Sequence, residues 1–144
     1  PIERMAEFRR LFDRLVGEFK PTHPLQVGVQ RAVYVAESQA DARAAAEEAR
    51  WNMRVTLSLR NQYERVEQGH AIPVPAPKEP DTDDLLDRFL VVGTPDTVIR
   101  QITRVRELVG ISHFNCSFWF GDLEHARVMR SMERFAREVL PAFQ

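Results

Sequence analysis

The 144-residue chain contains a single cysteine, Cys116. One thiol excludes an internal disulfide and any metal site built from several cysteines. Because Cys116 lies in an apolar segment, we expect a buried and unreactive thiol. The chain also lacks an apolar run near the roughly 18 to 20 residues that span a bilayer, and its N-terminal segment is charged rather than signal-like. We therefore expect a cytoplasmic protein with no membrane partner.

An excess of charge of one sign is also absent. The 20 basic and 21 acidic residues are interspersed and give a net charge of −1, so no basic surface is expected to attract nucleic acid. The sequence has no GxGxxG or Walker loop and no nucleophile elbow. His113, Glu124 and His125 are conceivable metal ligands, but one lies on a strand and two in an exposed first helical turn. We expect no metal site.

What the chain does contain is an alternation of helical and strand patterns. With 44% hydrophobic residues it can form one domain with a core. We expect helices over 2–19, 38–68, 84–89 and 95–109, a last helix stopped by Pro141, strands over 25–36, 90–92 and 111–120, and a loop with four prolines over 71–83. Strands joined by helical crossovers run parallel. The sequence therefore predicts an α/β fold with about three parallel strands.

The turn after the second strand carries several local signals. Gly93 permits a sharp turn, Thr94 is a helix N-cap and Pro95 fits the first helical position. Gly110 is expected to end this helix in the left-handed conformation. The free backbone donors at this N-terminus could hold a phosphate, but Asp96 already places a carboxylate in the first turn. Ordinary capping is the favoured interpretation.

The third strand alternates between an apolar and a mixed face. The apolar face carries Phe114, Cys116, Phe118 and Phe120, and the mixed face carries His113, Asn115, Ser117 and Trp119. If helices cover the sheet on one side, as in a barrel, the apolar face meets them and the mixed face looks inward. His113 and Asn115 then fill the core as hydrogen-bonded residues. Trp119, near the carboxyl end, is the better candidate for a ligand site.

Three segments together carry a resemblance. They are VYVAESQADARAAAE at 33–47, VVGTPDTVIRQI at 91–102 and FGDLEHARVMRSMERFAREVLPAF at 120–143. In order and spacing they resemble the C-terminal third of the bacterial luciferase-like monooxygenases. The resemblance implies a (β/α)8 TIM barrel, and because such barrels need about 250 residues, it implies that 1–144 is a single C-terminal portion with the last three strands. A first residue other than methionine agrees with that expectation.

The resemblance also implies a function for the parent protein. It implies an oxidoreductase that uses reduced flavin mononucleotide (FMN), or the deazaflavin F420 in some branches, with dioxygen and a small organic substrate. Trp119 and Phe120, and Gly93 and Thr94 on the preceding strand, would border flavin or substrate. Catalytic residues would lie in the missing N-terminal part, so none is assigned, and the fragment itself is expected to be inactive. The proline-rich loop could be a lid or a plain surface loop.

Two alternatives stay open at the level of sequence. The chain could be a non-enzymatic α/β binding or assembly module, or part of an F420-dependent oxidoreductase of the same superfamily. In either case, three strands cut from a closed barrel would leave unpaired edges and an uncovered inner face. We therefore expect a homo-oligomer.

Overall fold

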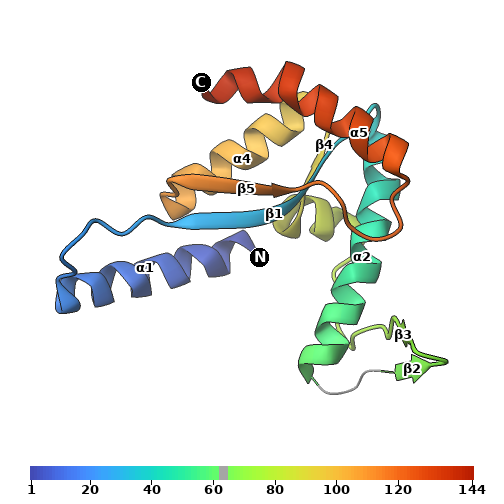
Figure 1. Ribbon diagram of the computed structural model, residues 1–144, viewed down its shortest axis with the longest axis horizontal. Helices are drawn as coiled ribbons and strands as arrows, with labels where there is room; N and C mark the ends of the chain where they lie inside the picture. Colours follow the sequence, from blue (N-terminus) through green and yellow to red (C-terminus); the bar gives the residue numbers. More distant parts are fainter. Residues whose placement is uncertain (62–64) are drawn as a thin grey trace.

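The computed structural model describes residues 1–61 and 65–144. Its α-helices are α1 (Ile2–Phe19), α2 (Gln39–Asn61), α3 (Thr82–Asp84), α4 (Pro95–Val109) and α5 (His125–Arg134). Its strands are β1 (Gly28–Val35), β2 (Arg65–Glu67), β3 (His70–Ile72), β4 (Val91–Gly93) and β5 (His113–Ser117). A π-helical turn, η1 (Leu85–Phe89), follows α3, and the turns η2 (Phe135–Val139) and η3 (Leu140–Phe143) follow α5 (Figure 1).

Three parallel strands form the main sheet, in the order β4-β1-β5. The amino half of β1 pairs with β5 and its carboxyl half with β4. Alternate residues of a strand direct their backbone groups to opposite edges. The carbonyl of the odd-numbered Val27 accepts a hydrogen bond from Ser112, next to β5, whereas the amide of the even-numbered Ala36 donates to Gly93 of β4. The strands β4 and β5 therefore lie on opposite edges of β1. The expected α/β class with three parallel strands is confirmed. In a closed barrel each strand pairs with its sequence neighbours, whereas here the first strand lies in the centre.

Both faces of the sheet are covered around the carboxyl half of β1. Tyr34 points into a core shared with the alanine face of α2, while Val33 and Val35 point into a core shared with α4. The alanines expected to pack, Ala42, Ala45, Ala46 and Ala49, are all buried. Helices thus lie on both sides here, not on one side as in the barrel-like expectation. The mixed face of β5 is more open, because His113 and Asn115 are exposed.

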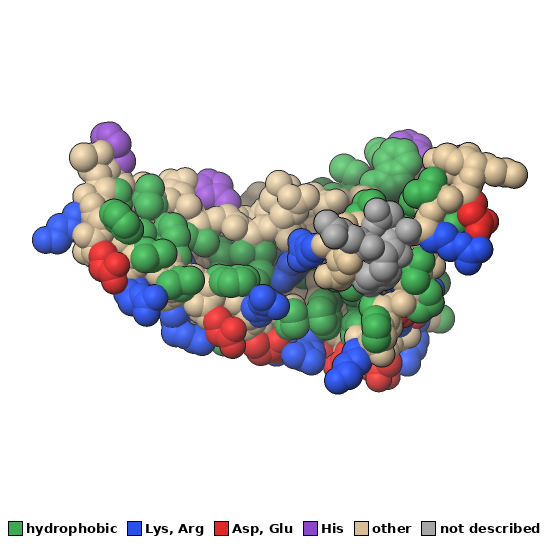
Figure 2. Space-filling model, turned by 90° about the horizontal axis from the view of Figure 1, so that it is seen from below, with side chains coloured by type: hydrophobic (Ala, Val, Ile, Leu, Met, Phe, Trp, Pro, Cys, Tyr) green, Lys and Arg blue, Asp and Glu red, His purple; other side chains and the backbone are tan. Residues whose placement is uncertain are grey.

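Helix α1 lies along the amino half of β1 (Figure 1). Its start packs on α4 through Ile2, and the Arg9 guanidinium donates to the carbonyl of Val109 at 2.8 Å. Hydrophobic side chains farther along the helix stay exposed and gather with charged ones at the left of Figure 2. They are Phe8, Leu11, Leu15 and Phe19.

The expected continuation of the second helix to Gln68 is wrong. Helix α2 runs without a break to Asn61, and β2 and β3 then form an antiparallel hairpin. Gln68 and Gly69, with φ of 49° and 82°, make its two-residue turn, a conformation that matches strand twist and favours glycine. Tyr63, which was assigned to the helix, lies outside the described residues. The loop expected over 71–83 is correspondingly shorter, because Ala71 and Ile72 belong to β3.

The proline-rich segment is fixed to α2. The Glu79 carboxylate accepts hydrogen bonds from Nε and Nη2 of Arg54, both at 2.8 Å, and from the Ala76 amide at 2.9 Å. Arg50 donates to the Pro80 carbonyl at 2.6 Å. The hydrogen bond from Arg54 is the main reason that the pKa of Glu79 is lowered. These contacts favour a surface loop over a lid.

The C-terminal helix buries only part of the face that its sequence suggests. The spacing of Met129, Met132, Phe135, Ala136 and Val139 predicts one packed face, but Met129, Met132 and Ala136 are exposed. Val139 is buried as predicted, Phe135 packs against the same core, and Val128 and Ser131 are buried in addition. The Ser131 hydroxyl accepts a hydrogen bond from the Val35 amide at 2.7 Å and so closes the edge of β1 beyond β5.

Pro141 also differs from expectation. It was assigned as the stop of the last helix, but it lies inside η3, after a π-helical turn has already ended the α-helix. Proline fits there because the first positions of a helical turn do not need an amide donor.

Candidate functional site

The turn at the end of β4 is shaped by the chain's own packing. Thr94 is the N-cap residue of α4, with Pro95 next to it, and Gly110 ends the helix with φ of 62°. A Cβ on Gly93 would lie 2.7 Å from Cγ2 of Thr97, which explains the glycine. The Thr94 hydroxyl lies 3.2 Å from the Thr97 hydroxyl. Thr94 and Gly110 hold the expected cap positions, but no side-chain hydrogen bond from Thr94 caps the backbone amides at the start of α4.

The two aromatic candidates after β5 have different environments. Trp119 is 65% exposed, and its ring centroid lies 6.2 Å from that of His125. Phe120 is 4% exposed and belongs to the core beneath α2. Trp119 can therefore face a ligand or another polypeptide, whereas Phe120 has no free surface. The strand β1 separates both from Gly93 and Thr94, because β4 and β5 lie on its opposite edges.

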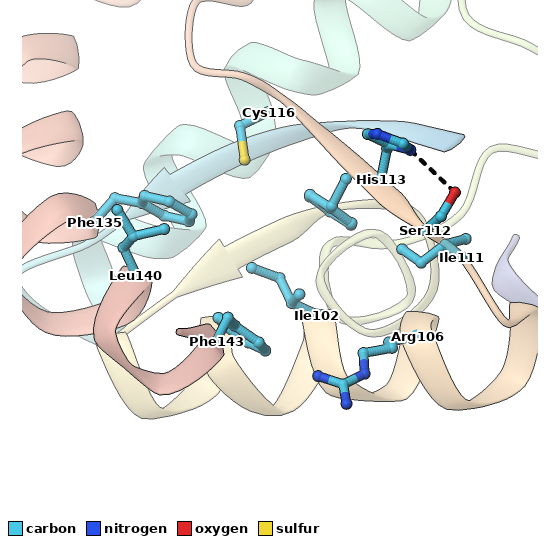
Figure 3. Close-up of a pocket in the computed structure, with 10 residues that line it drawn as sticks. Ile102, Arg106, Ile111, Ser112, His113, Cys116, Phe135, Leu140 and Phe143 are labelled. Carbon is cyan, nitrogen blue, oxygen red and sulfur yellow. Dashed lines mark hydrogen bonds between the residues drawn. The ribbon is translucent and has the colours of Figure 1, made fainter. Parts of the chain in front are cut away.

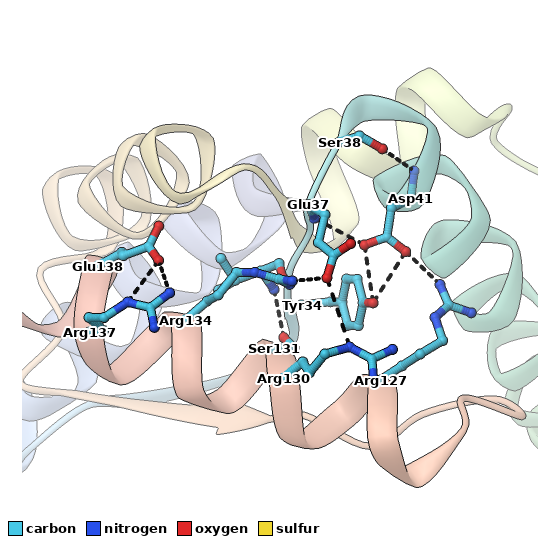
Figure 4. Close-up of polar contacts among 11 residues, drawn as sticks. Tyr34, Glu37, Ser38, Asp41, Arg127, Arg130, Ser131, Arg134, Arg137 and Glu138 are labelled. Atoms are coloured by element: carbon cyan, nitrogen blue, oxygen red, sulfur yellow. Dashed lines mark hydrogen bonds and ion pairs between the residues drawn. The ribbon is translucent and has the colours of Figure 1, made fainter.

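A polar cluster that sequence reasoning missed lies at the carboxyl end of β1 (Figure 4). The Tyr34 hydroxyl donates to Asp41 at 3.2 Å, Arg127 donates to Asp41 at 2.8 Å, and the Glu37 amide donates to it at 3.1 Å. The Arg127 guanidinium also stacks 5.7 Å from the centre of the Tyr34 ring. The Ser38 hydroxyl accepts a hydrogen bond from the Asp41 amide at 3.1 Å at the start of α2.

The protonation states of this cluster follow from its contacts. Burial alone would raise the pKa of Asp41, but the hydrogen bonds from Glu37, Arg127 and Tyr34 lower it. Burial raises the pKa of Tyr34. At neutral pH the cluster is therefore a carboxylate, a guanidinium and a neutral phenol. Its groups satisfy one another, so it joins β1, α2 and α5 and offers little free bonding capacity to a ligand. No local motif reveals it, since Asp41 and Arg127 are 86 residues apart.

A cavity of about 250 Å³ lies on the α4 side of the sheet (Figure 3). Its apolar wall is made of Ile102, Phe114, Cys116, Phe135, Leu140 and Phe143. Arg106 and the hydrogen-bonded pair Ser112–His113 (3.0 Å) lie at its polar end. Burial raises the pKa of the Cys116 thiol, so it stays protonated. Sequence reasoning placed Phe114 and Cys116 against helices, which is correct, but did not foresee a space between them.

The described part of the chain shows no cluster of metal ligands. Across residues 1–61 and 65–144, no three His, Cys, Asp or Glu side chains gather as a metal site would require. Within the same ranges, no helix combines the length and apolar character needed to cross a bilayer.

The comparisons with known proteins define the family. A family model for the luciferase-like monooxygenases matches residues 1–112. The chain therefore belongs to the luciferase-like monooxygenase family. The match ends before β5, so it does not include Trp119 and Phe120.

A solved structure shows a similar fold. Monooxygenase RslO1 from Streptomyces bottropensis superimposes with a TM-score of 0.70 and 18% sequence identity, over 100% of this chain and 39% of that protein. At this identity the likeness concerns the fold alone. The chain thus spans well under half the length of that monooxygenase. A search of curated proteins finds no match.

Proposed function

We propose that this chain is the C-terminal section of a flavin-dependent luciferase-like monooxygenase that oxidises a small organic substrate with dioxygen. The observation that carries the proposal is the family match over residues 1–112. The similar fold of a monooxygenase supports it. We propose reduced FMN as the cofactor, with F420 as the alternative within the same superfamily.

The chain's own residues do not fit a complete flavin site. A phosphate here would rest on the uncapped backbone amides at the start of α4 alone, because the Thr94 hydroxyl pairs with Thr97 and Gly93 packs on the same side chain. Phe120 is buried in the core. Trp119 alone among the four sequence candidates offers a large exposed surface. We therefore propose that the flavin site needs polypeptide beyond these 144 residues, and we assign no reaction step to the chain by itself.

The contribution of this section would be positional. The Asp41 cluster and the Ser131 hydrogen bond hold the carboxyl end of β1 against α2 and α5. In parallel α/β folds ligands bind beyond the carboxyl ends of the strands. We propose that this edge forms one wall of the active site, and that Trp119 orients substrate or excludes water there.

Flavin titration tests the proposal. Oxidised FMN, anaerobically reduced FMN and F420 would each be added to the chain while tryptophan fluorescence is followed, with Trp51→Phe reporting on Trp119 and Trp119→Phe reporting on Trp51. We expect no saturable quenching at micromolar flavin. Stoichiometric binding would contradict the idea that the flavin site lies elsewhere. Monooxygenase activity of a longer chain containing this section would support the family function.

A second candidate, a non-enzymatic binding or assembly module, is favoured by one observation. The carboxyl half of β1 is buried on both faces, with Val33 and Val35 fully covered, so the chain encloses part of its own core. This candidate predicts a compact monomer that unfolds cooperatively at low concentration. The monooxygenase section predicts self-association or dependence on further polypeptide.

A further inference from the structure

The cavity between α4, β5 and the C-terminal turns plays no part in the function proposed above. Three phenyl rings, those of Phe114, Phe135 and Phe143, line it together with aliphatic side chains (Figure 3). An apolar ligand of matching shape would gain dispersion contacts with these side chains. The wall therefore favours an apolar group.

The charge around the cavity has one sign. Among its lining residues, Arg106 is a permanent cation, and no aspartate or glutamate takes part. In the described ranges no carboxylate side chain forms an ion pair with Arg106. Its guanidinium is thus available to an anion and can bind a carboxylate with two parallel hydrogen bonds.

The dimensions limit the ligand further. About 250 Å³ is below the range of roughly 300 to 1,000 Å³ that is usual for drug-sized ligands. Helix α4, strand β5 and the turns η2 and η3 line the space, which is also open to solvent. A space of this volume fits a small molecule better than a peptide or another helix.

We propose that this cavity binds a compact hydrophobic monocarboxylate, with its apolar body among the phenyl rings and its carboxylate on Arg106. An arylalkanoate of the size of 3-phenylpropionate matches both the rings and the cation. The site is separate from the carboxyl edge of the sheet, so its existence does not depend on flavin chemistry.

Binding can be measured directly on the full chain. Calorimetric titration with 3-phenylpropionate would be compared with titration of the neutral 3-phenylpropionamide. Because Cys116 lines the cavity and is the single cysteine, its rate of alkylation by N-ethylmaleimide reports occupancy. We expect one saturable site for the acid, at least fivefold weaker binding of the amide, and slower alkylation of Cys116 when the acid is present.

Arg106→Gln supplies the decisive variant. The residue is exposed, so the fold should persist, and loss of a charge-assisted pair should weaken binding of the acid by roughly fivefold. Arg10→Gln makes the same change at an exposed position of α1 and should leave affinity unchanged. The proposal is overturned if the acid does not bind, if acid and amide bind equally, if Arg106→Gln has no effect, or if bound acid leaves Cys116 alkylation unchanged.

Discussion

Glu79 connects the proline-rich segment to α2, and its replacement by glutamine tests that connection. The side chain is 14% exposed, and it accepts two hydrogen bonds from Arg54 and one from the Ala76 amide. Glutamine has the same shape but no charge, and it presents one acceptor and one donor. One hydrogen bond from Arg54 would then be accepted by a neutral oxygen. In place of the other, the glutamine NH2 group and the guanidinium would face each other as two donors.

The size of the effect follows from these bonds. A hydrogen bond to a charged group contributes about 1.5 to 3 kcal/mol and a neutral one about 0.5 to 1.5 kcal/mol. Since Arg54 is partly exposed and can regain water, we expect Glu79→Gln to lower the free energy of unfolding by about 2 kcal/mol. For a domain of this size that corresponds to a decrease in Tm of about 4 to 8 °C. Urea denaturation and calorimetry measure both quantities.

The same contact gives a pH dependence. Glu79 has a folded-state pKa below its unfolded value of about 4.3. Its stabilisation is therefore present above the unfolded pKa and is lost as the pH falls through the folded pKa. The difference in stability between the natural chain and Glu79→Gln should be full at pH 7 and should shrink below about pH 4.

The matched control is Glu67→Gln on the hairpin. Glu67 pairs with Arg65, but both side chains are more than half exposed, so the change should be less than about 0.5 kcal/mol. An equal effect of the two substitutions, or a Glu79→Gln effect that stays constant down to pH 3, would refute this reasoning. Glu79 would then not be a buried carboxylate that stabilises the fold through Arg54 and the Ala76 amide.

Three further predictions concern packing, the candidate site and assembly. Ser131→Ala should lower the free energy of unfolding by about 1 to 2 kcal/mol, because it leaves the buried Val35 amide without its acceptor; urea denaturation should show a smaller loss for Ser58→Ala, whose hydroxyl bonds within its own helix. Trp119→Ala should change stability by less than about 0.5 kcal/mol and lower turnover in a longer, active chain; equal losses of stability and activity would indicate a core role. Light scattering across a dilution series should show a homo-oligomer, and a compact monomer throughout would contradict this.

Signals that depend on neighbouring residues were readable from the sequence. The start and end of α4 follow from Thr94, Pro95 and Gly110, whose conformations are set within one turn. The alanine face of α2 likewise follows from helical spacing. The hairpin was missed because Val66 fitted the helical period, although Gln68–Gly69 provided a turn signal.

Features that depend on distant residues were not readable. Ser131 of α5 is buried where it accepts a hydrogen bond from Val35, 96 residues away, and a serine does not count as apolar in a periodicity argument. The order of the strands depends on which edge of β1 each later strand reaches, and alternation within a strand carries no such information.

The candidate site shows the same division. The strand expected over 111–120 ends at Ser117, so Phe120 lies beyond it, and its burial depends on how the chain crosses α2. The Asp122 amide donates to Glu48 at 2.8 Å, and a Cβ on Gly121 would collide with the backbone of the same residue. This crossing draws Phe120 under the helix and leaves Trp119 outside.

The division of β1 between two partners places a boundary inside one continuous strand. In its amino half, the backbone groups of odd-numbered residues such as Val29 and Arg31 face β5, so their amide protons are protected only while β5 stays attached. Amides from Val33 onward are enclosed by two cores and should exchange only when the whole domain opens. Deuterium exchange along these eight residues should therefore change from fast to slow near Ala32.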